Sequence, residues 1–357
     1  MSTLLDVKNL SVEFRVQAGT VKAVEGVSFR IRAATTAAIV GESGSGKSTI
    51  AQAIMRILPN TATITSGQIL FTDQNEQYQI QDAGLPDEII DIAQLDSNDK
   101  RMQSIRGGRI SMIFQEPMTS LSPLHTIGNQ IVEAMRLHSN VSNSEALEAV
   151  SEMLNIVGFP NPKSSLDTYP FELSGGLRQR AMIAMALVCQ PALLIADEPT
   201  TALDVTIQAQ ILKLIKDLQL KLKMAVLIIT HDLGVVANVA DEVIVMYGGR
   251  VMEAGTVDDI YRKGSHPYLK SLLRAVPRFD MIPGERLIPI REIKPTTGHL
   301  LTPKDGEGSS TVEKTPILRV QNLTKEFFTR KTGMFGGITQ NIKAVDDVSF
   351  EVNKGET

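Results

Sequence analysis

The sequence has 357 residues, about twice the length of an ordinary domain, which allows one large domain or two smaller ones. Its residues are 43% hydrophobic and 21% charged, a composition that excludes disordered and collagen-like chains and predicts a soluble globular protein. The net charge of -4 lacks the basic excess that dedicated nucleic-acid-binding proteins carry, so no nucleic-acid partner is expected.

The sequence also argues against a membrane span and a disulfide framework. The longest apolar run, residues 181–189, is far shorter than the roughly 18 to 20 residues that cross a bilayer. The first residues lack a basic region followed by an apolar core, which argues against a secretory signal and favours a cytoplasmic protein. Cys189 is the single cysteine, and its apolar neighbours predict a buried, unreactive thiol.

The chain begins with a pattern typical of a β-hairpin. Apolar residues alternate with polar ones at Leu5, Val7, Leu10, Val12 and Phe14, a turn follows at Gly19, and a second strand covers residues 24–31. A short apolar strand at 36–40 then leads into a glycine-rich loop and a helix, as in an α/β unit. Residues 72–104 are rich in Asp, Gln and Asn without a clear period, so we expect a solvent-facing excursion there.

The middle of the chain alternates helices with short apolar strands. Seven apolar residues at helical spacing predict a helical insertion, namely Ile131, Met135, Leu147, Val150, Met153, Leu154 and Val157. A helix at 176–188 and a strand at 192–196 follow. The next helix carries an apolar stripe of Ile207, Ile211, Leu214, Leu218 and Leu222, and a strand at 225–230 closes the series. This order predicts a largely parallel sheet covered on both faces.

The last part of the sequence contains a linker and a repeat. Glycines and prolines interrupt residues 278–316. Beyond them, LRVQNLTKEF at 318–327 repeats LDVKNLSVEF at 5–14, and IKAVDDVSFEV at 342–352 repeats VKAVEGVSFRI at 21–31. The second offset, 321 residues, places another glycine-rich loop near position 362, beyond the end of the sequence. We therefore expect a domain at 1–277, the linker at 278–316, and the start of a second domain at 317–357 that stops before its phosphate loop.

GESGSGKST at 41–49 fits the phosphate-loop pattern G-x-x-x-x-G-K-[ST] between a strand and a helix. The loop comprises Gly41, Glu42, Ser43, Gly44, Ser45, Gly46, Lys47, Ser48 and Thr49. Its glycines let backbone amides turn toward phosphates, Lys47 would reach the outer phosphates, and Ser48 would bind Mg²⁺. An ordinary glycine-rich turn is the alternative, but chance rarely places this pattern between a strand and a helix. The loop therefore predicts ATP and Mg²⁺ as ligands.

ALLIADEPT at 192–200 is a buried strand that ends in two acids. Asp197 would belong to the Mg²⁺ shell, and Glu198 would orient or deprotonate the attacking water. Alone, such a pair is as often a helix cap or a surface feature. The phosphate loop earlier in the chain favours the catalytic interpretation.

LSGGLRQR at 173–180 places Ser174, Gly175 and Gly176 directly before a helix, where they could cap that helix or present amides and a hydroxyl to an anion. The segment precedes the acidic strand and resembles the signature motif of the ATP-binding subunits of ABC transporters. The resemblance implies an α/β fold, a P-loop NTPase of the ABC ATPase type. Such a fold has a mostly parallel sheet core, an amino-terminal antiparallel β subdomain and a helical subdomain at about 117–172.

Other positions match the same family. Gln115, in SMIFQEP, resembles the Q-loop glutamine that contacts Mg²⁺ and water and relays to the membrane partner. His231 resembles the switch histidine at the γ-phosphate. Asp204 resembles a D-loop residue that communicates across the dimer, although it could simply cap the next helix. Phe14 resembles the aromatic residue that stacks on adenine, but core packing explains it equally well.

Four segments indicate one branch of this family. FQEPMTSLSP at 114–123, YPFELSGGLRQR at 169–180, ADEPTTALDVTIQAQIL at 196–212 and SHPYLKSLLRAVP at 265–277 resemble the dipeptide, oligopeptide and nickel importer group. The tandem layout is most similar to the fused ATPases of glutathione and peptide importers. The resemblance implies ATP hydrolysis that powers peptide import, two membrane permease subunits, an external solute-binding protein, and a peripheral location on the cytoplasmic face of the bacterial inner membrane. Residues 117–135 would dock a permease or form the core of the helical subdomain.

Two residues depart from the expected patterns. Leu177 stands where the signature usually has glutamine. Ala34 stands in a turn where the second copy has Gly355, so we expect this turn to avoid a positive φ angle. The chain also has no cysteine cluster near its carboxyl end, so no iron–sulfur cluster is expected.

The resemblance implies that each ATP lies between two domains, so that one domain holds half of a site. Lys47 would face the signature of a second ABC domain in the same chain, or that of another copy. We therefore expect nucleotide binding with weak or absent hydrolysis by this chain alone. The alternatives are a soluble ABC ATPase that acts on ribosomes or DNA, and a non-catalytic ATP-binding fragment. The short linker, broken by prolines and glycines, argues against the ribosome-acting kind.

Overall fold

The computed structural model describes residues 2–17, 19–72, 89–115, 120–201, 203–274, 316–329 and 340–352. The chain divides into two compact units, Met1–Ile293 and Lys294–Thr357. Within the described residues, no helix combines the length and the apolar character needed to cross a membrane.

A small antiparallel sheet opens the first unit. Its strands are β1 (Thr3–Val16), β2 (Gly19–Arg32), β4 (Ala62–Phe71) and β5 (Ile90–Asp91), in the order β2-β1-β4-β5. The alternation predicted for the first strand is confirmed, because Leu5, Val7, Leu10 and Val12 are all fully buried. This sheet is the expected amino-terminal antiparallel β subdomain.

The solvent-facing excursion expected at 72–104 is wrong for its last part. There the chain forms β5, the short 3₁₀ helix η2 (Ile92–Gln94) and helix α2 (Lys100–Ile105). Ile92, Met102 and Ile105 are buried in the core under the antiparallel sheet. Three isolated apolar residues anchor this segment, too few to show a period in the sequence. Residues 73–88 lie outside the described part of the chain.

A six-stranded sheet forms the centre of the first unit. Its strands are β3 (Thr36–Val40), β6 (Ile110–Ile113), β7 (Leu193–Asp197), β8 (Ala225–Thr230), β9 (Glu242–Tyr247) and β10 (Arg250–Thr256), in the order β10-β9-β3-β8-β7-β6. All neighbours pair in parallel except β9 and β10. Every residue of β3, β7 and β8 is buried, as expected for a sheet covered on both faces. The strand at 225–230 is not the last, since β9 and β10 follow it.

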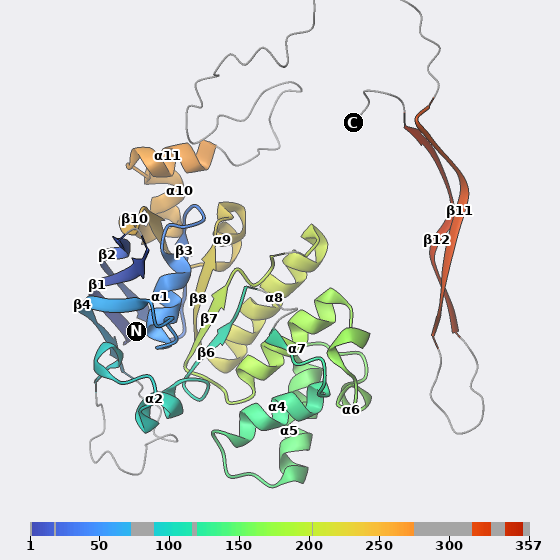
Figure 1. The fold of residues 1–357 in the computed structure, drawn as a ribbon, viewed down its shortest axis with the longest axis horizontal. Helices are drawn as coiled ribbons and strands as arrows, with labels where there is room; N and C mark the ends of the chain where they lie inside the picture. Colours follow the sequence, from blue (N-terminus) through green and yellow to red (C-terminus); the bar gives the residue numbers. More distant parts are fainter. Residues whose placement is uncertain are drawn as a thin grey trace, which may run out of the picture. The chain divides into compact units, whose positions relative to one another are not determined.

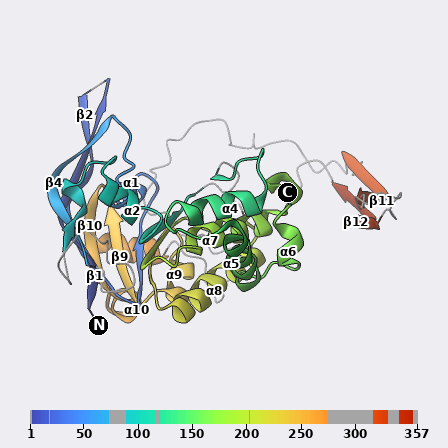
Figure 2. The same cartoon turned by 90° about the horizontal axis from the view of Figure 1, so that it is seen from below.

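Helices cover the central sheet and extend beyond it. Those that connect or follow its strands are α1 (Lys47–Ile54), α7 (Gly175–Leu187), α8 (Val205–Leu222), α9 (Leu233–Val239), α10 (Val257–Lys263) and α11 (Pro267–Arg274). A second group consists of α4 (Ile127–Arg136), α5 (Asn143–Ile156), α6 (Pro162–Ser165) and the 3₁₀ helix η3 (Pro170–Glu172). Figures 1 and 2 place α4, α5 and α6 beyond the central sheet, on the side away from β1, β2 and β4.

The apolar stripe predicted on α8 packs against the core as part of a wider apolar face. Ile211 and Leu218 are buried as expected, but Ile207, Leu214 and Leu222 are only half-buried. Leu212 and Ile215 are buried as well. Helix α8 therefore uses a wider face than one stripe, because it packs against both α7 and α9.

Two single-residue expectations are also corrected. Ala34 adopts a left-handed backbone with φ 57°, and its carbonyl accepts a hydrogen bond from Nε2 of Gln219 at 2.8 Å. The turn thus keeps the glycine-like conformation with an alanine, supported by this bond. Cys189 is half-buried rather than buried, and its Sγ donates to the Ala134 carbonyl at 3.7 Å.

The second unit contains an antiparallel pair, β11 (Leu318–Thr329) and β12 (Gln340–Val352). Its register repeats that of β1 and β2 at the offsets found in the sequence. Leu318 pairs with Val352 as Leu5 pairs with Ile31. The irregularities repeat too, since Asn322 has φ 49° where Asn9 has φ 48°. The sequence repeat is therefore also a repeat of backbone geometry.

Candidate nucleotide-binding site

Four neighbouring strands of the central sheet end beside the predicted site residues. Strand β3 leads to Gly41, β8 to His231, β7 ends at Asp197 and is followed by Glu198, and β6 is followed by Gln115. These strands are adjacent in the sheet and parallel. Their carboxyl ends meet at one edge, which is where open α/β sheets bind ligands.

The phosphate loop requires glycine at its two ends. A Cβ on Gly41 would lie 2.1 Å from the Met246 carbonyl oxygen, and one on Gly46 would lie 2.3 Å from that of Ala23. Both residues also have positive φ angles, 156° and 93°. The loop is therefore held tightly between strand β2 and the end of β9. Helix α1 starts directly after Gly46, so its amino-terminal amides belong to the loop.

Lys47 is buried, with its ammonium group turned back onto the loop. Its Nζ donates to the carbonyl oxygens of Gly41 at 2.8 Å and Glu42 at 2.7 Å, and to Oγ of Ser45 at 3.4 Å. Burial lowers the pKa of Lys47, and the charges of Glu198, Asp197 and Glu42 only partly oppose this effect. A buried cation of this kind is a fitting partner for a phosphate group.

Ser48 and Asp197 supply two oxygen atoms at one place. Oγ of Ser48 donates to Oδ1 of Asp197 at 3.1 Å. Burial raises the pKa of Asp197, a shift that the Ser48 hydrogen bond opposes and the nearby Glu198 charge adds to. Hard oxygen donors next to a phosphate loop are the ligand type that Mg²⁺ prefers, so these residues fit that ion.

Glu198 is the centre of a small polar network. Its carboxylate accepts hydrogen bonds from Nε2 of Gln115 at 2.9 Å and Oγ1 of Thr201 at 3.0 Å, and lies 3.2 Å from Nδ1 of His231. Burial raises the pKa of Glu198, but the hydrogen bonds from His231 and Thr201 and the charges of His231 and Lys47 outweigh it and bring the pKa below its usual value. The carboxylate is therefore ionised near neutral pH, as a base that binds water must be.

The backbone at Glu198 has an uncommon conformation. Glu198 has a positive φ angle of 45°, which is uncommon for a residue with a side chain. Its amide donates to the carbonyl of Ile229 in the next strand at 2.8 Å. The turn after β7 is therefore fixed to β8, and the carboxylate points toward Gln115 and His231.

The signature and D-loop residues act as helix caps in this structure. Oγ of Ser174 accepts from the amide of Leu177 at 3.4 Å, so Ser174 caps α7 ahead of Gly175 and Gly176. Asp204 caps α8 through bonds from Thr206 and Ile207. The capping interpretation that the sequence left open is thus correct for both.

Phe14 lies at the edge of the core of the antiparallel sheet. It is half-buried on β1, packs against the core of the antiparallel sheet and pairs with Val21 across the hairpin. Part of the ring is thus accessible, while the rest serves the core.

Sequence reasoning missed two side chains that touch the site. Gln179 on α7 is buried, and its Nε2 donates to the carbonyl of Pro199 at 2.5 Å. The hydroxyl of Tyr268 accepts a hydrogen bond from the amide of Glu42 at 3.2 Å. Gln179 is a polar residue on an apolar helical face, a signal that was present in the sequence. Tyr268 lies in the segment at 265–277 that resembles the importer group, but nothing in the sequence connects it to the phosphate loop.

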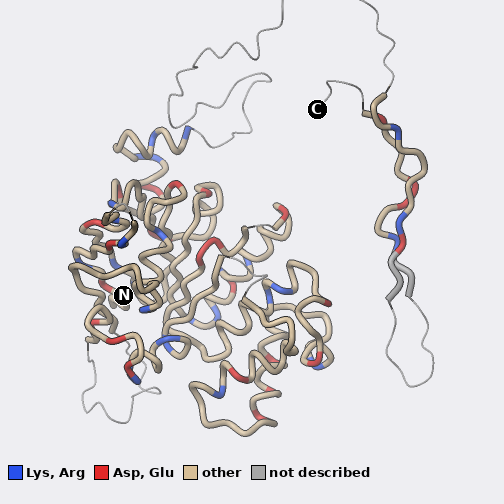
Figure 3. Tube along the Cα trace, in the orientation of Figure 1, with Lys and Arg blue, Asp and Glu red and all other residues tan. Residues whose placement is uncertain are grey.

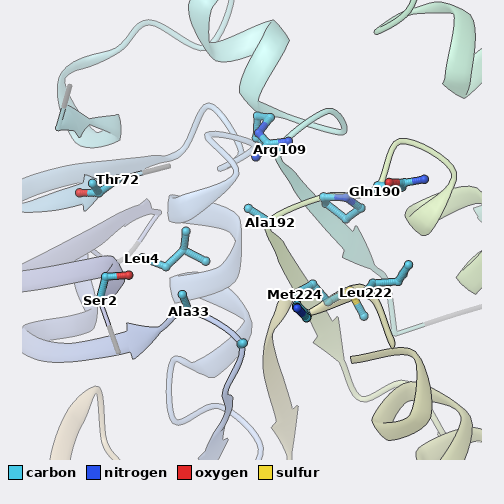
Figure 4. Close-up of a pocket in the computed structure, with 12 residues that line it drawn as sticks. Ser2, Leu4, Ala33, Thr72, Arg109, Gln190, Ala192, Leu222 and Met224 are labelled. Carbon is cyan, nitrogen blue, oxygen red and sulfur yellow. The ribbon is translucent and has the colours of Figure 1, made fainter. Parts of the chain in front are cut away.

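A separate pocket lies at the other end of the central strands, away from the phosphate loop (Figure 4). It has a volume of about 370 Å³, and Arg109, Ala192 and Met224 among its lining residues immediately precede β6, β7 and β8. Because it lies at the amino ends of these strands, it is distinct from the phosphate loop and from Glu198.

Comparison with known proteins agrees with this geometry. The family model described as ABC transporter matches residues 24–201. The chain is 45% identical over 355 residues to the glutathione import ATP-binding protein GsiA of Salmonella choleraesuis (strain SC-B67), and 43% identical over 357 residues to that of Escherichia coli (strain K12). Each alignment covers 99% of this chain and 55% of the relative. The chain thus spans about half the length of the curated relatives it matches.

Solved structures show the same fold. A dimeric post-hydrolysis state of the ATP-binding cassette MJ0796, bound to ADP and Pi, matches with a TM-score of 0.58 and 25% identity over 71% of this chain and 99% of that one. CbiO1 of Clostridium perfringens, part of the ABC transporter complex cbiONQ, matches with a TM-score of 0.58 and 28% identity over 77% of this chain and 96% of that one. The fold is therefore the P-loop fold of ABC ATPases, and the chain belongs to the ABC transporter family of ATP-binding proteins.

Proposed function

We propose that this chain is an ATP-binding and ATP-hydrolysing subunit that powers an ABC importer for glutathione-like or other small peptides. The observation that carries the proposal is the convergence of Lys47, which follows β3, with Asp197 and Glu198, at the end of β7, around one phosphate loop. The 45% identity to a glutathione import ATP-binding protein over 99% of the chain supports the peptide branch.

The chemistry is phosphoryl transfer to water. Amides of the phosphate loop and the Lys47 ammonium would bind the phosphates and stabilise the charge that develops on them. Ser48, Asp197 and Gln115 would hold Mg²⁺, which neutralises phosphate charge when bound. Glu198 would orient the attacking water and accept its proton, and His231, 3.2 Å from that carboxylate, would help to place it against the γ-phosphate.

The signature motif indicates that a second domain completes the site. Ser174 lies at the amino end of α7, and no hydrogen bond among the described residues joins it to the phosphate loop of its own unit. In the proposal it contacts a nucleotide held by a second ABC domain in cis or by another copy in trans. The hairpin of β11 and β12, which repeats β1 and β2, supports a tandem arrangement.

The remaining partners in the proposal are two membrane permeases and, through them, an external solute-binding protein, at the cytoplasmic face of the bacterial inner membrane. Leu124, Leu137 and Phe171 are 81%, 74% and 65% exposed around the helical group, which suits contact with a protein surface. Figure 3 shows Lys and Arg interspersed with Asp and Glu over the described chain rather than gathered as a nucleic-acid-binding surface requires.

A mixing experiment tests the proposal in trans. In a pair of identical copies, each of the two ATP sites would need Lys47 from one copy and Ser174 from the other. Lys47→Ala and Ser174→Arg should therefore each abolish ATP hydrolysis of the 357-residue chain, because each substitution damages both sites. A mixture of the two variants should regain about a quarter of the wild-type rate, since about half of randomly formed pairs are mixed and each has one intact site. Wild-type turnover that is independent of protein concentration, or no recovery on mixing despite wild-type turnover, would contradict the shared site.

A further inference from the structure

The segment SHPY at 265–268, which ends at Tyr268, is held firmly in place by β10. The Glu253 carboxylate on β10 accepts hydrogen bonds from the amides of Ser265 and His266, both at 2.9 Å. Helix α11 follows, and its Leu269 and Leu272 are buried in a core that includes residues of β3 and β9. The start of α11 is therefore anchored to the sheet beside the phosphate loop.

Tyr268 extends this anchor to the loop itself. Its hydroxyl accepts a hydrogen bond from the Glu42 amide at 3.2 Å, and its ring lies 4.5 Å from that of Tyr247, centroid to centroid. The turn after Tyr247 also reaches the loop, because the amide of Gly249 donates to the Ser45 carbonyl at 3.2 Å. Elements that follow β8 thus hold the loop at two points from outside.

Glu42, whose amide donates to Tyr268, is also one of the residues that bind Lys47. The Glu42 amide points to Tyr268, while its carbonyl accepts from Nζ of Lys47 at 2.7 Å. Residue 42 therefore joins α11 on one side to the cation that would meet the phosphates on the other. Burial raises the pKa of Tyr268, so the group that accepts this bond is the neutral hydroxyl.

We propose that Tyr268 is a positioning residue for nucleotide binding, whose hydroxyl fixes the Glu42 peptide and thereby the start of the phosphate loop. The inference rests on the nucleotide-binding part of the proposed function and is independent of hydrolysis and of the transported solute. It assigns a purpose to the HPY segment, which links α11 to the ATP site.

Tyr268→Phe tests this assignment with little change in packing. The variant should bind ATP with Mg²⁺ about fivefold more weakly in equilibrium dialysis, the equivalent of one hydrogen bond of average strength. Its melting temperature without nucleotide should fall by only about 2 to 4 °C, because the same hydrogen bond is already present in the nucleotide-free chain. Under turnover conditions KM should rise while kcat stays constant, because the bond is present before and during the reaction.

Two variants provide matched controls. Tyr247→Phe keeps the ring pair, and no hydrogen bond from the Tyr247 hydroxyl to the loop is described. Tyr261→Phe removes a tyrosine hydroxyl of the preceding helix that donates to the Leu233 carbonyl rather than to the loop. Both controls should retain the wild-type ATP affinity. Equal affinity in Tyr268→Phe, or an equal loss in all three variants, would overturn the assignment.

A second measurement does not depend on any variant folding well. If α11 and the loop are coupled, nucleotide binding must strengthen the docking of α11 as much as docking strengthens binding. Amide hydrogen exchange over residues 265–274 should therefore slow when ATP binds to the wild-type chain. Unchanged exchange at saturating ATP would refute the coupling between α11 and the phosphate loop, and with it the inference on Tyr268, but not the proposed function. Absence of ATP binding by the wild-type chain would overturn the proposed function and this inference together.

Discussion

Oγ of Ser48 lies 3.1 Å from Oδ1 of Asp197, although 149 residues separate them in the sequence. Ser48 belongs to the first turn of α1, after β3, and Asp197 is the last residue of β7. Strand β8 lies between these two strands, so the contact spans a whole strand of the sheet. The parallel sheet therefore brings together two side-chain oxygen atoms that the sequence keeps far apart.

This contact predicts how the chain depends on Mg²⁺. Asp197→Asn keeps the size of the side chain but removes its negative charge. The Mg²⁺ concentration for half-maximal ATP hydrolysis or ATP binding should rise by about tenfold or more, since even outer-shell partners of a metal are worth that much. Asp217→Asn, at an exposed position of α8, is the matched control and should leave the Mg²⁺ titration unchanged. An identical titration for both variants would exclude Asp197 from the metal site.

The network around Glu198 predicts a separation of binding from hydrolysis. Glu198→Gln can still accept hydrogen bonds from Gln115 and Thr201, but it no longer accepts a proton. Phosphate release should fall by about a hundredfold or more, whereas ATP affinity should stay within about twofold. Glu152→Gln, at an exposed position of α5, controls for the loss of one negative charge. A Glu198→Gln chain that hydrolyses ATP at the wild-type rate would rule out this carboxylate as the base.

Burial of Lys47 predicts that arginine cannot replace it. The side chain is only 5% exposed and its Nζ has three acceptors within the loop. A guanidinium group is larger and planar, so it would have to displace the loop backbone. Lys47→Arg should therefore lose the rise in melting temperature that ATP causes in the wild-type chain, although the charge is conserved. Lys213→Arg, at an exposed position on α8, should keep that rise; loss of the rise in both variants would contradict this explanation.

Sequence patterns were sufficient where one local rule decided the structure. Strand β8 was predicted residue for residue, because 225–229 is an unbroken apolar run that ends at Thr230. The phosphate loop was identified because its glycines meet a backbone requirement that no other residue satisfies, as the close approach of Gly41 to Met246 shows. The register of β11 and β12 followed from the repeat.

Sequence patterns were insufficient where tertiary contacts decide the structure. Ala34 and Glu198 both take positive φ angles; the Ala34 carbonyl accepts a hydrogen bond from Gln219, and the Glu198 amide donates one to Ile229. Propensity alone would place neither there. Tyr268 approaches Glu42 only because β9, β10 and α10 turn the chain back to the loop. Such contacts depend on the complete fold.

The environment of Cys189 predicts slow thiol chemistry with a definite pH dependence. Burial raises the pKa of Cys189 from 9.0 to about 11. At pH 8 about one thiol in a thousand is then ionised, compared with about one in ten for an ordinary cysteine, and only the thiolate reacts. Alkylation of the folded chain at pH 8 should be about a hundredfold slower than that of the denatured chain. The rate for the folded chain should rise about tenfold per pH unit toward pH 11; a plateau above pH 9 would contradict the raised pKa.

Gln179 connects the signature helix to the turn that carries Glu198. Its Nε2 donates to the Pro199 carbonyl, one residue after Glu198, and the side chain is 1% exposed. Gln179→Leu would leave that carbonyl unpaired, but it would also remove Oε1, which is buried without a partner among the described residues. The free energy of unfolding should therefore fall by only about 1 kcal/mol, and the melting temperature by about 2 to 4 °C.

The effect of the same substitution on turnover should be larger than its effect on stability. Release of Pro199 would let the Glu198 turn relax, so kcat should fall by about tenfold, because small displacements of a catalytic group are costly. ATP affinity should stay unchanged, since Gln179 does not touch the phosphate loop in the described structure. Gln210→Leu, at an exposed position of α8, should change neither quantity. A Gln179→Leu chain that loses stability but keeps its kcat would show that this hydrogen bond serves packing alone.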